Sequence, residues 1–197
     1  MKTIVLATLL LTAGGFHAAS AASAAIAPSA PKTPQQAVES YIASLTGGRF
    51  EEAAAQMDER DLLRFRGILQ SLLEVQAKPG EPSPLALLDG VKDFAAAQAL
   101  SGPAFFNAFL NGLAKLNPSF AASLRSASGE VLGSVPEGAD TLHFVCRSNS
   151  KMGELSLTKM TVVTVRRVGG EWKIALSGEI EGLAETIRQS VLRRKAG

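Results

Sequence analysis

Cysteine, histidine, tyrosine and tryptophan are scarce in this chain, and the scarcity limits the chemistry it can perform. The sequence has one cysteine, one tryptophan, one tyrosine and two histidines. A lone Cys146 excludes an internal disulfide. It follows Phe144 on the apolar side of a predicted strand, which predicts a buried and unreactive thiol. His143 has no cysteine or carboxylate at ligand spacing, so we expect no metal site and no cofactor.

Excess charge and long apolar runs are also lacking. The 20 Lys and Arg residues nearly balance the 18 Asp and Glu residues, giving a net charge of +2. We therefore expect no binding of nucleic acid. After the N-terminal region, no apolar run approaches the ~20 residues of a spanning helix, so we expect no transmembrane span in the mature chain. A phosphate-binding G-x-x-x-x-G-K loop is absent as well.

The N-terminus carries an export signature. Lys2 precedes an apolar run over residues 4–11, and Ala-x-Ala sites end at Ala21 and Ala24. This pattern predicts a secretory signal peptide over residues 1–24 and a periplasmic or secreted location, with an N-terminal membrane anchor as the alternative. Residues 25–32, rich in alanine, serine and proline, are predicted to be a disordered lead-in. Residues 33–195 are then one domain.

A β-hairpin can be placed with its register. The run 154–168 alternates and is rich in β-branched residues, and Gly169-Gly170 separates it from residues 171–177. Two glycines favour a tight turn, which opposes Val165 to Ile174, and Val163 to Leu176. The apolar face then carries Leu155, Leu157, Val163, Val165, Trp172, Ile174 and Leu176. Lys159 and Thr161 interrupt this face, which suggests a bulge or burial of both faces, while Met160 and Val162 fall on the polar side.

Helices are predicted before and after the sheet. Thr33 and Gln36 form a capping box around Pro34, and Gly47-Gly48 ends the first helix. Further helices are predicted at about 50–57, from Asp58 to Gln76, over Leu85–Leu100, from Ser101 to Asn117, and after Leu176. Strands at Ser126–Val135 and Thr141–Arg147, a turn at Asn149–Gly153 and the hairpin complete a four-stranded antiparallel meander. The fold class is α+β, with N-terminal helices packed on the sheet and a C-terminal helix.

Three segments resemble the nuclear transport factor 2-like superfamily. They are Thr-Pro-Gln-Gln-Ala-Val-Glu-Ser-Tyr at 33–41, Gly-Gly-Arg-Phe-Glu-Glu-Ala at 47–53, and Gly-Gly-Glu-Trp-Lys-Ile at 169–174. The resemblance implies a curved sheet whose concave face holds helices and a conical pocket. The final Trp-Lys strand followed by a helix is also similar to periplasmic phospholipid-shuttling carriers. The long helical segment Leu85–Asn117 and the terminal helix depart from the superfamily pattern.

An apolar pocket between sheet and helices is the leading functional hypothesis. Phenylalanine is concentrated between Phe94 and Phe109, either as an ordinary core-packed lid or as a cavity wall. The expected partner is an apolar or lipid-like small molecule, bound without catalysis. The alternative is a structural or interaction protein that uses the same surface to form a homodimer or to bind another partner. The predicted lining residues are Tyr41, Phe65, Leu69, Phe105, Phe106, Phe109, Val163, Val165, Trp172 and Ile174.

Two further hypotheses remain. The superfamily includes isomerases and dehydratases, so the resemblance would make Tyr41, Asp61 and His143 the candidate catalytic residues of a small-molecule isomerase or hydrolase. Their default roles are a core tyrosine, a residue at a helix start and a side chain turned away from the apolar face. Separately, Arg147, Arg166 and Lys173 could form a basic patch. Arg166 and Lys173 are directly opposed, which costs stability unless a carboxylate or anion lies between them.

Overall fold

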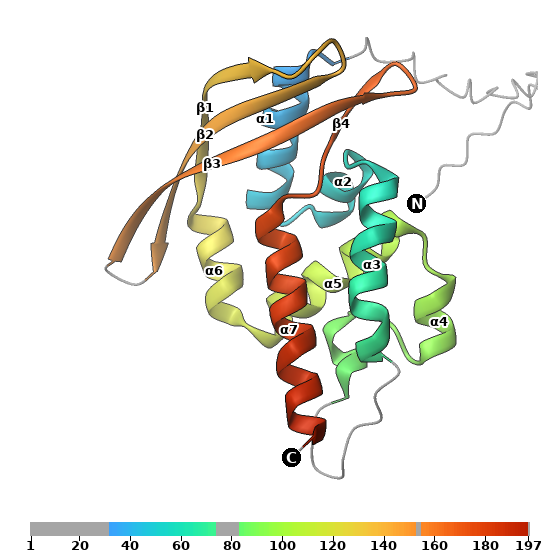
Figure 1. Cartoon of the computed structure of the whole chain (residues 1–197). Helices are drawn as coiled ribbons and strands as arrows, with labels where there is room; N and C mark the ends of the chain where they lie inside the picture. The colour runs from blue at the N-terminus through green and yellow to red at the C-terminus, as the bar shows by residue number, and fades with distance from the viewer. Residues whose placement is uncertain (1–31, 74–82, 153–154, 197) are drawn as a thin grey trace, which may run out of the picture. The chain divides into compact units, whose positions relative to one another are not determined.

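The structure is a computed structural model, and it describes residues 32–73, 83–152 and 155–196. The predicted signal peptide, and all of the lead-in but Lys32, lie outside these ranges. Within them, four strands form one antiparallel sheet in the order β1-β2-β3-β4 (Figure 1). The strands are β1 (Ser128–Pro136), β2 (Thr141–Met152), β3 (Leu155–Val168) and β4 (Glu171–Ile174). Together with the helices they confirm the α+β class and the meander.

The hairpin register is confirmed over the length of β4. Val165 opposes Ile174 and Arg166 opposes Lys173. Gly169 and Gly170 have φ values of 58° and 87°, a conformation that residues with a side chain rarely adopt. The predicted pairing of Val163 with Leu176 is wrong, because β4 ends at Ile174. The chain leaves the sheet there and begins the last helix.

Eight helical segments surround the sheet in the described ranges. Thr33 and Gln36 form the predicted capping box, and Pro34 is the first residue of the first helix. Gly48, just after that helix, has a φ of 70°. The segments are α1 (Pro34–Thr46), α2 (Phe50–Ala55), α3 (Glu59–Leu73), the 3-10 helix η1 (Pro84–Leu87), α4 (Phe94–Ala99), α5 (Gly102–Leu116), α6 (Pro118–Ser126) and α7 (Gly178–Ala196).

Three local predictions need correction. The expected helix Leu85–Leu100 is broken into η1 and α4, with Gly90 at a φ of 74° between them. Asn117-Pro118 ends α5 but also begins α6, because the Asn117 side chain accepts a hydrogen bond from the Phe120 N–H at 3.1 Å. β2 continues to Met152 through the predicted turn at Asn149–Gly153. The predicted end of α3 at Gln76 lies outside the described residues.

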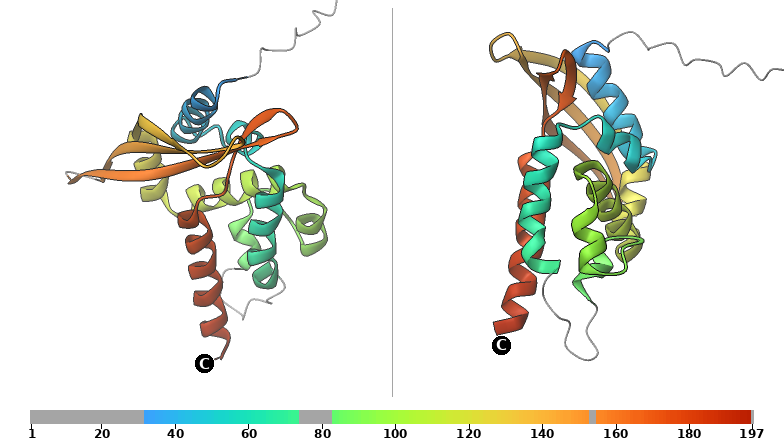
Figure 2. Two further views of the ribbon diagram at one scale, coloured as in Figure 1. Left: turned by 45° about the horizontal axis from the view of Figure 1, so that its top comes forward. Right: turned by 90° about the vertical axis from the view of Figure 1, so that its right-hand side faces the viewer.

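The helices cover one face of the sheet. α1 lies across all four strands, α6 packs against β2, and α3 lies beside α7 (Figure 2). Phe144, Cys146 and Val165 point from the sheet into this core and are at most 4% exposed. The burial predicted for Cys146 is therefore confirmed. None of the described helices is long and apolar enough to cross a lipid bilayer.

The opposite face of the sheet is open. Met160 and Val162 are 53% and 55% exposed, as their placement on the polar side predicts. Leu157 was expected on the covered face but is 44% exposed, because the far end of the β2–β3 ribbon extends past the helices. Trp172 is half-buried, and the Arg167 guanidinium lies 5.9 Å from its ring centroid.

Candidate functional site

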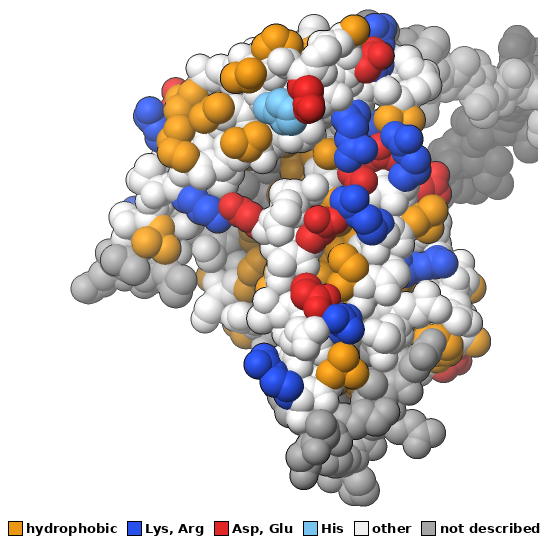
Figure 3. Space-filling model, viewed as in Figure 1, with side chains coloured by type: hydrophobic (Ala, Val, Ile, Leu, Met, Phe, Trp, Pro, Cys, Tyr) orange, Lys and Arg blue, Asp and Glu red, His pale blue; other side chains and the backbone are white. Residues whose placement is uncertain are grey.

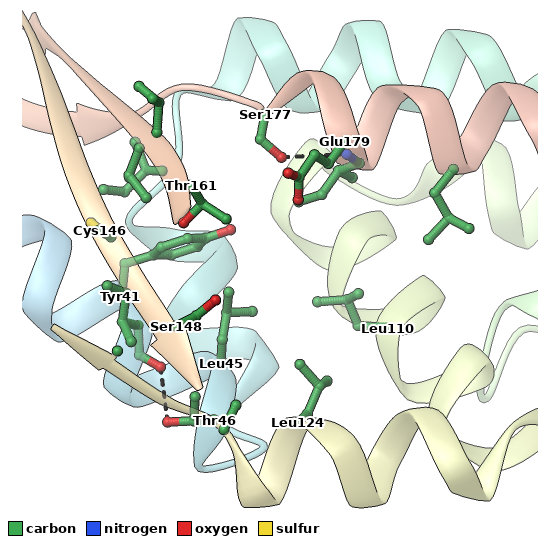
Figure 4. Close-up of a pocket in the computed structure, with 18 of the residues that line it drawn as sticks. Tyr41, Leu45, Thr46, Leu110, Leu124, Cys146, Ser148, Thr161, Ser177 and Glu179 are labelled. Carbon is green, nitrogen blue, oxygen red and sulfur yellow. Dashed lines mark hydrogen bonds between the residues drawn. The ribbon is translucent and has the colours of Figure 1, made fainter. Parts of the chain in front are cut away.

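A cavity of about 750 Å³ lies between the inner face of the sheet and the helices (Figure 4). This volume falls within the ~300–1,000 Å³ typical of small-molecule sites. Its walls are formed by α1, α5, α6, the first turns of α7 and residues from all four strands. The lining residues that matter below are Tyr41, Phe106, Phe109, Leu110, Phe120, Leu124, Ala127, Cys146, Ser148, Thr161, Val163, Ser177 and Glu179.

The short length of β4 explains why this space exists. β4 pairs only with the Val165–Val168 end of β3. Beyond it, the Ala175 N–H still donates to the Thr164 carbonyl at 2.8 Å, and then the chain turns into α7. Within the described part of the chain, the preceding residues of β3 therefore have no strand on that side. Thr161 and Val163 line the cavity along this free edge.

Most of the wall is apolar. α5 contributes Phe106, Phe109 and Leu110, and α6 contributes Phe120 and Leu124. Phe106 and Phe109 are fully buried in the protein, so they form a fixed surface rather than mobile side chains. Burial of apolar ligand surface against such a wall contributes about 25 cal/mol per Å². The cavity is thus suited to an apolar molecule.

The polar groups at the cavity are mostly hydroxyls, and several of them are already used. The Thr46 hydroxyl donates to the Ile42 carbonyl at 3.0 Å, and the Ser148 hydroxyl donates to the Lys159 carbonyl at 3.3 Å. The Ser177 hydroxyl accepts from the Ile180 N–H at 3.3 Å. Burial raises the pKa of Tyr41 well above its usual range, which keeps its hydroxyl neutral.

An ion pair joins the two sides of the cavity mouth. Glu179 lines the cavity from the first turn of α7, and its carboxylate lies 2.7 Å from the Lys159 ammonium of β3. Figure 4 shows Glu179 on the α7 side, across from Thr161 and Tyr41. In the space-filling view the surface is hollowed between the sheet and α7 (Figure 3). The pair explains why a lysine lies on the covered face of β3, where its charge had suggested a bulge.

The sequence carries a signal for this site at two positions of β3. Lys159 and Thr161 interrupt an otherwise apolar strand face, and the β2–β3 register is regular at both residues. The only irregularity in the described sheet lies in β1, between Val131 and Gly133. Polar residues at inward positions of a regular strand indicate that the strand faces a cavity there. Neither Lys159 nor Glu179 was among the predicted site residues.

The predicted pocket residues divide between the cavity and the core. Tyr41, Phe106, Phe109, Val163 and Ile174 line the cavity, whereas Phe65, Leu69, Phe105, Val165 and Trp172 do not. Phe65 and Leu69 belong to α3, which was expected to form a wall. Instead α3 packs between α5 and α7, away from the cavity, and its place is taken by α1, α6 and the start of α7.

The three cations of the predicted basic patch are each paired with a carboxylate. Arg147 lies 3.5 Å from Glu130, and Lys173 lies 2.9 Å from Glu171. Arg166 forms a short hydrogen bond with Asp61. That carboxylate offsets the repulsion expected between the directly opposed Arg166 and Lys173. The three residues do not contribute to the cavity.

Asp58 and Asp61 form the centre of a buried ion network at the start of α3. The two residues are 2% and 4% exposed. The Asp61 carboxylate also accepts from the Leu176 N–H at 2.9 Å and lies 3.6 Å from the Arg64 guanidinium, which in turn pairs with Glu181 of α7 at 2.6 Å. The network therefore fixes the chain where it passes from β4 into α7.

Asp58 is ionised within this network. A hydrogen bond from the Arg60 side chain holds the pKa of the Asp58 carboxyl below its ordinary value, against the opposing effect of burial.

The Asp58 N–H donates to the Ile174 carbonyl at 2.8 Å, and the Ile174 N–H donates to the Gln56 carbonyl at 2.9 Å. The segment before α3 thereby protects the edge of β4 from pairing with another chain.

The candidate catalytic residues lie in three different places. Tyr41 lines the cavity, Asp61 is in the ion network, and His143 lies on the open face of the sheet. The His143 ring nitrogens are 2.9 Å from the Thr164 hydroxyl and 2.7 Å from the Glu137 carboxylate. The described residues include no group of three or more His, Cys, Asp or Glu placed to hold a metal ion.

Comparison with known proteins adds little to this picture. No protein-family model matches the chain, and no curated protein matches it. Among solved structures, the chain is similar to an NTF-2-like protein of unknown function from Shewanella oneidensis MR-1. The identity is 10%, the TM-score is 0.39, and the likeness covers 72% of this chain and 90% of that chain. Function must therefore be argued from the cavity itself.

Proposed function

We propose that this chain is an exported, non-enzymatic protein that binds an apolar or lipid-like small molecule in the cavity beneath its sheet. The observation that carries the proposal is the cavity of about 750 Å³ with predominantly apolar walls. Export is supported by the signal-peptide pattern of residues 1–24. The motifs at 33–41 and 169–174 support membership of the nuclear transport factor 2-like superfamily.

The polar groups at the cavity favour binding over catalysis, since they are mostly hydroxyls and the one charged side chain among the described lining residues, Glu179, is paired with Lys159. Proton transfer at neutral pH requires a group whose pKa lies near the pH, such as a shifted carboxylate or a histidine. Tyr41 is the candidate catalytic residue that lines the cavity, and burial raises its pKa further from neutrality. Its hydroxyl is suited to donating a hydrogen bond to a bound molecule.

Filling part of the cavity should weaken binding. Ala127 lines it at the end of α6, and Ala127→Trp would occupy space that the ligand needs. We expect an environment-sensitive apolar dye to bind the exported protein, and the variant to bind it about ten-fold more weakly, equivalent to ~1.4 kcal/mol. Fluorescence titration measures both. The intact mass of the same preparation reports whether the first 21 to 24 residues have been removed.

The matched control is Ala122→Trp, which changes an exposed residue of the same helix that does not line the cavity. It should bind the dye as the unchanged protein does. Equal affinity of all three proteins would place the dye elsewhere and remove the support for a cavity site. Thermal unfolding of each variant confirms that a loss of binding is not a loss of fold.

Homodimer formation is the second candidate function, favoured by the open face of the sheet. Val135, Met160 and Val162 are 53–59% exposed there, an unusual grouping for a face in contact with water. If this face pairs two copies, Met160→Lys should weaken the dimer about ten-fold or more. Light scattering across a concentration series measures it. A monomer at all concentrations for the unchanged protein would exclude this function.

A further inference from the structure

The cavity carries charge of one sign. Among the described residues that line it, Glu179 is the one with a charged side chain. The other polar side chains are hydroxyls, the thiol of Cys146 aside. Hydroxyls accept or donate hydrogen bonds and do not select the sign of a ligand's charge. A carboxylate does select it, so any preference for a charged ligand depends on Glu179 and on what neutralises it.

Lys159 neutralises Glu179 from outside the set of lining residues. The two side chains are each 59% exposed, and Lys159 is not a lining residue. An exposed pair of this kind is weak, because water solvates both ions well. A long lysine side chain can therefore move into solvent at little cost. Glu179 remains in place, because it belongs to the first turn of α7, where a carboxylate is favoured by the helix dipole.

The rest of the lining is suited to the apolar part of a ligand. Four aromatic residues are among it, Tyr41, Phe106, Phe109 and Phe120, and they come from α1, α5 and α6. A carboxylate beside such an apolar wall is complementary to a positive group attached to an apolar body. An anionic group would instead meet Glu179.

We propose that the ligand is an apolar molecule ending in an amine or alkylammonium group, and that this cation replaces Lys159 as the partner of Glu179. The inference rests on the proposed function, since it names the class of molecule that the cavity holds. It makes Lys159 a competitor for Glu179 rather than a binding residue. Removing the two side chains should consequently have opposite effects on the binding of a cation.

The test compares ligands that share one tail and differ in charge: octanol, octylamine and octanoate, with octyltrimethylammonium as the alkylated cation. The affinity of each ligand is measured by its displacement of the apolar dye at neutral pH and low salt. Octylamine should bind up to about five-fold more tightly than octanol, because an exposed ion pair contributes no more than that. Octanoate should bind more weakly than octanol. Glu179→Gln should remove the preference of octylamine over octanol. Lys159→Gln should increase it.

The control is Glu171→Gln, which breaks another carboxylate–lysine pair, with Lys173 at 2.9 Å, away from the cavity. It should leave the ligand order unchanged. If octanol itself fails to displace the dye, the proposed cavity function is wrong. If octanol binds but octylamine binds no better than octanoate, the cavity function stands and the present inference is overturned. Tighter binding of octanoate that disappears in Lys159→Gln would assign an anionic ligand instead.

Discussion

Replacing Phe65 by alanine should lower the free energy of unfolding by about 4–5 kcal/mol, the upper range for loss of a core phenylalanine. Phe65 is fully buried at the centre of an aromatic cluster. Its ring centroid lies 5.0 Å from Phe109, 5.3 Å from Phe106 and 6.3 Å from Phe105, each in an edge-to-face arrangement. Such pairs contribute ~0.5–1.5 kcal/mol each beyond their buried area. The deletion therefore loses apolar burial and ring contacts, and it leaves a cavity.

Urea unfolding followed by circular dichroism measures this change. The matched control is Leu63→Ala in the same helix, where the side chain is 45% exposed and the cost should stay below about 1 kcal/mol. A similar cost for both variants would mean that α3 is not packed as described.

Phe106 and Phe109 contact Phe65 and also line the cavity. The Phe65 variant should consequently bind apolar ligands more weakly even where it remains folded.

Replacing Asp61 by alanine should cost about 3 kcal/mol, because it leaves charged and polar partners without their acceptor. Arg166 loses its close carboxylate and keeps only Asp58, whose carboxylate is 3.6 Å away. The buried Leu176 N–H loses the acceptor that Asp61 provides. Arg166 is 34% exposed, so water moderates the loss and places it at the low end of the ~3–5 kcal/mol for broken buried pairs.

The Asp61→Asn variant separates the two contributions. The amide oxygen still accepts from Leu176, whereas the charge opposite Arg166 is gone, so the cost should fall to about half that of alanine. Glu185→Ala is the control, since it removes a partly exposed pair with Arg188 within one helix and should cost at most about 1 kcal/mol. Equal costs for alanine and asparagine would assign the whole effect to the charge. A cost below that of the Glu185 variant would contradict the structural role of the network.

The same network connects stability to the candidate site. Asp61 holds Leu176, two residues before α7 begins, and Arg64 holds Glu181 in the first turn of that helix. Glu179 lies between these two anchored positions. Loosening the network should therefore displace Glu179 and weaken its pairing with Lys159. This is a physical link between the core and the mouth of the cavity.

Elements with a local cause can be predicted from the residues alone. Gly169-Gly170 and the alternation around it placed the β3–β4 register, because a two-residue turn and a period of two leave one consistent pairing. Thr33, Pro34 and Gln36 placed the start of α1, because a capping box is satisfied within one turn. The same alternation predicted the burial of Cys146. These features depend on residues that are close in the chain.

The position of the cavity and the side chains that surround it depend instead on long-range packing. Phe65 and Phe106 have the same apolar helical pattern, yet one is at the centre of the core and the other lines the cavity. The partners of Asp61 are 105 and 115 residues away along the chain, at Arg166 and Leu176. Periodicity states which face of an element is apolar but not what packs against it. That choice depends on the early end of β4, which separates α7 from β3 and opens the space between them.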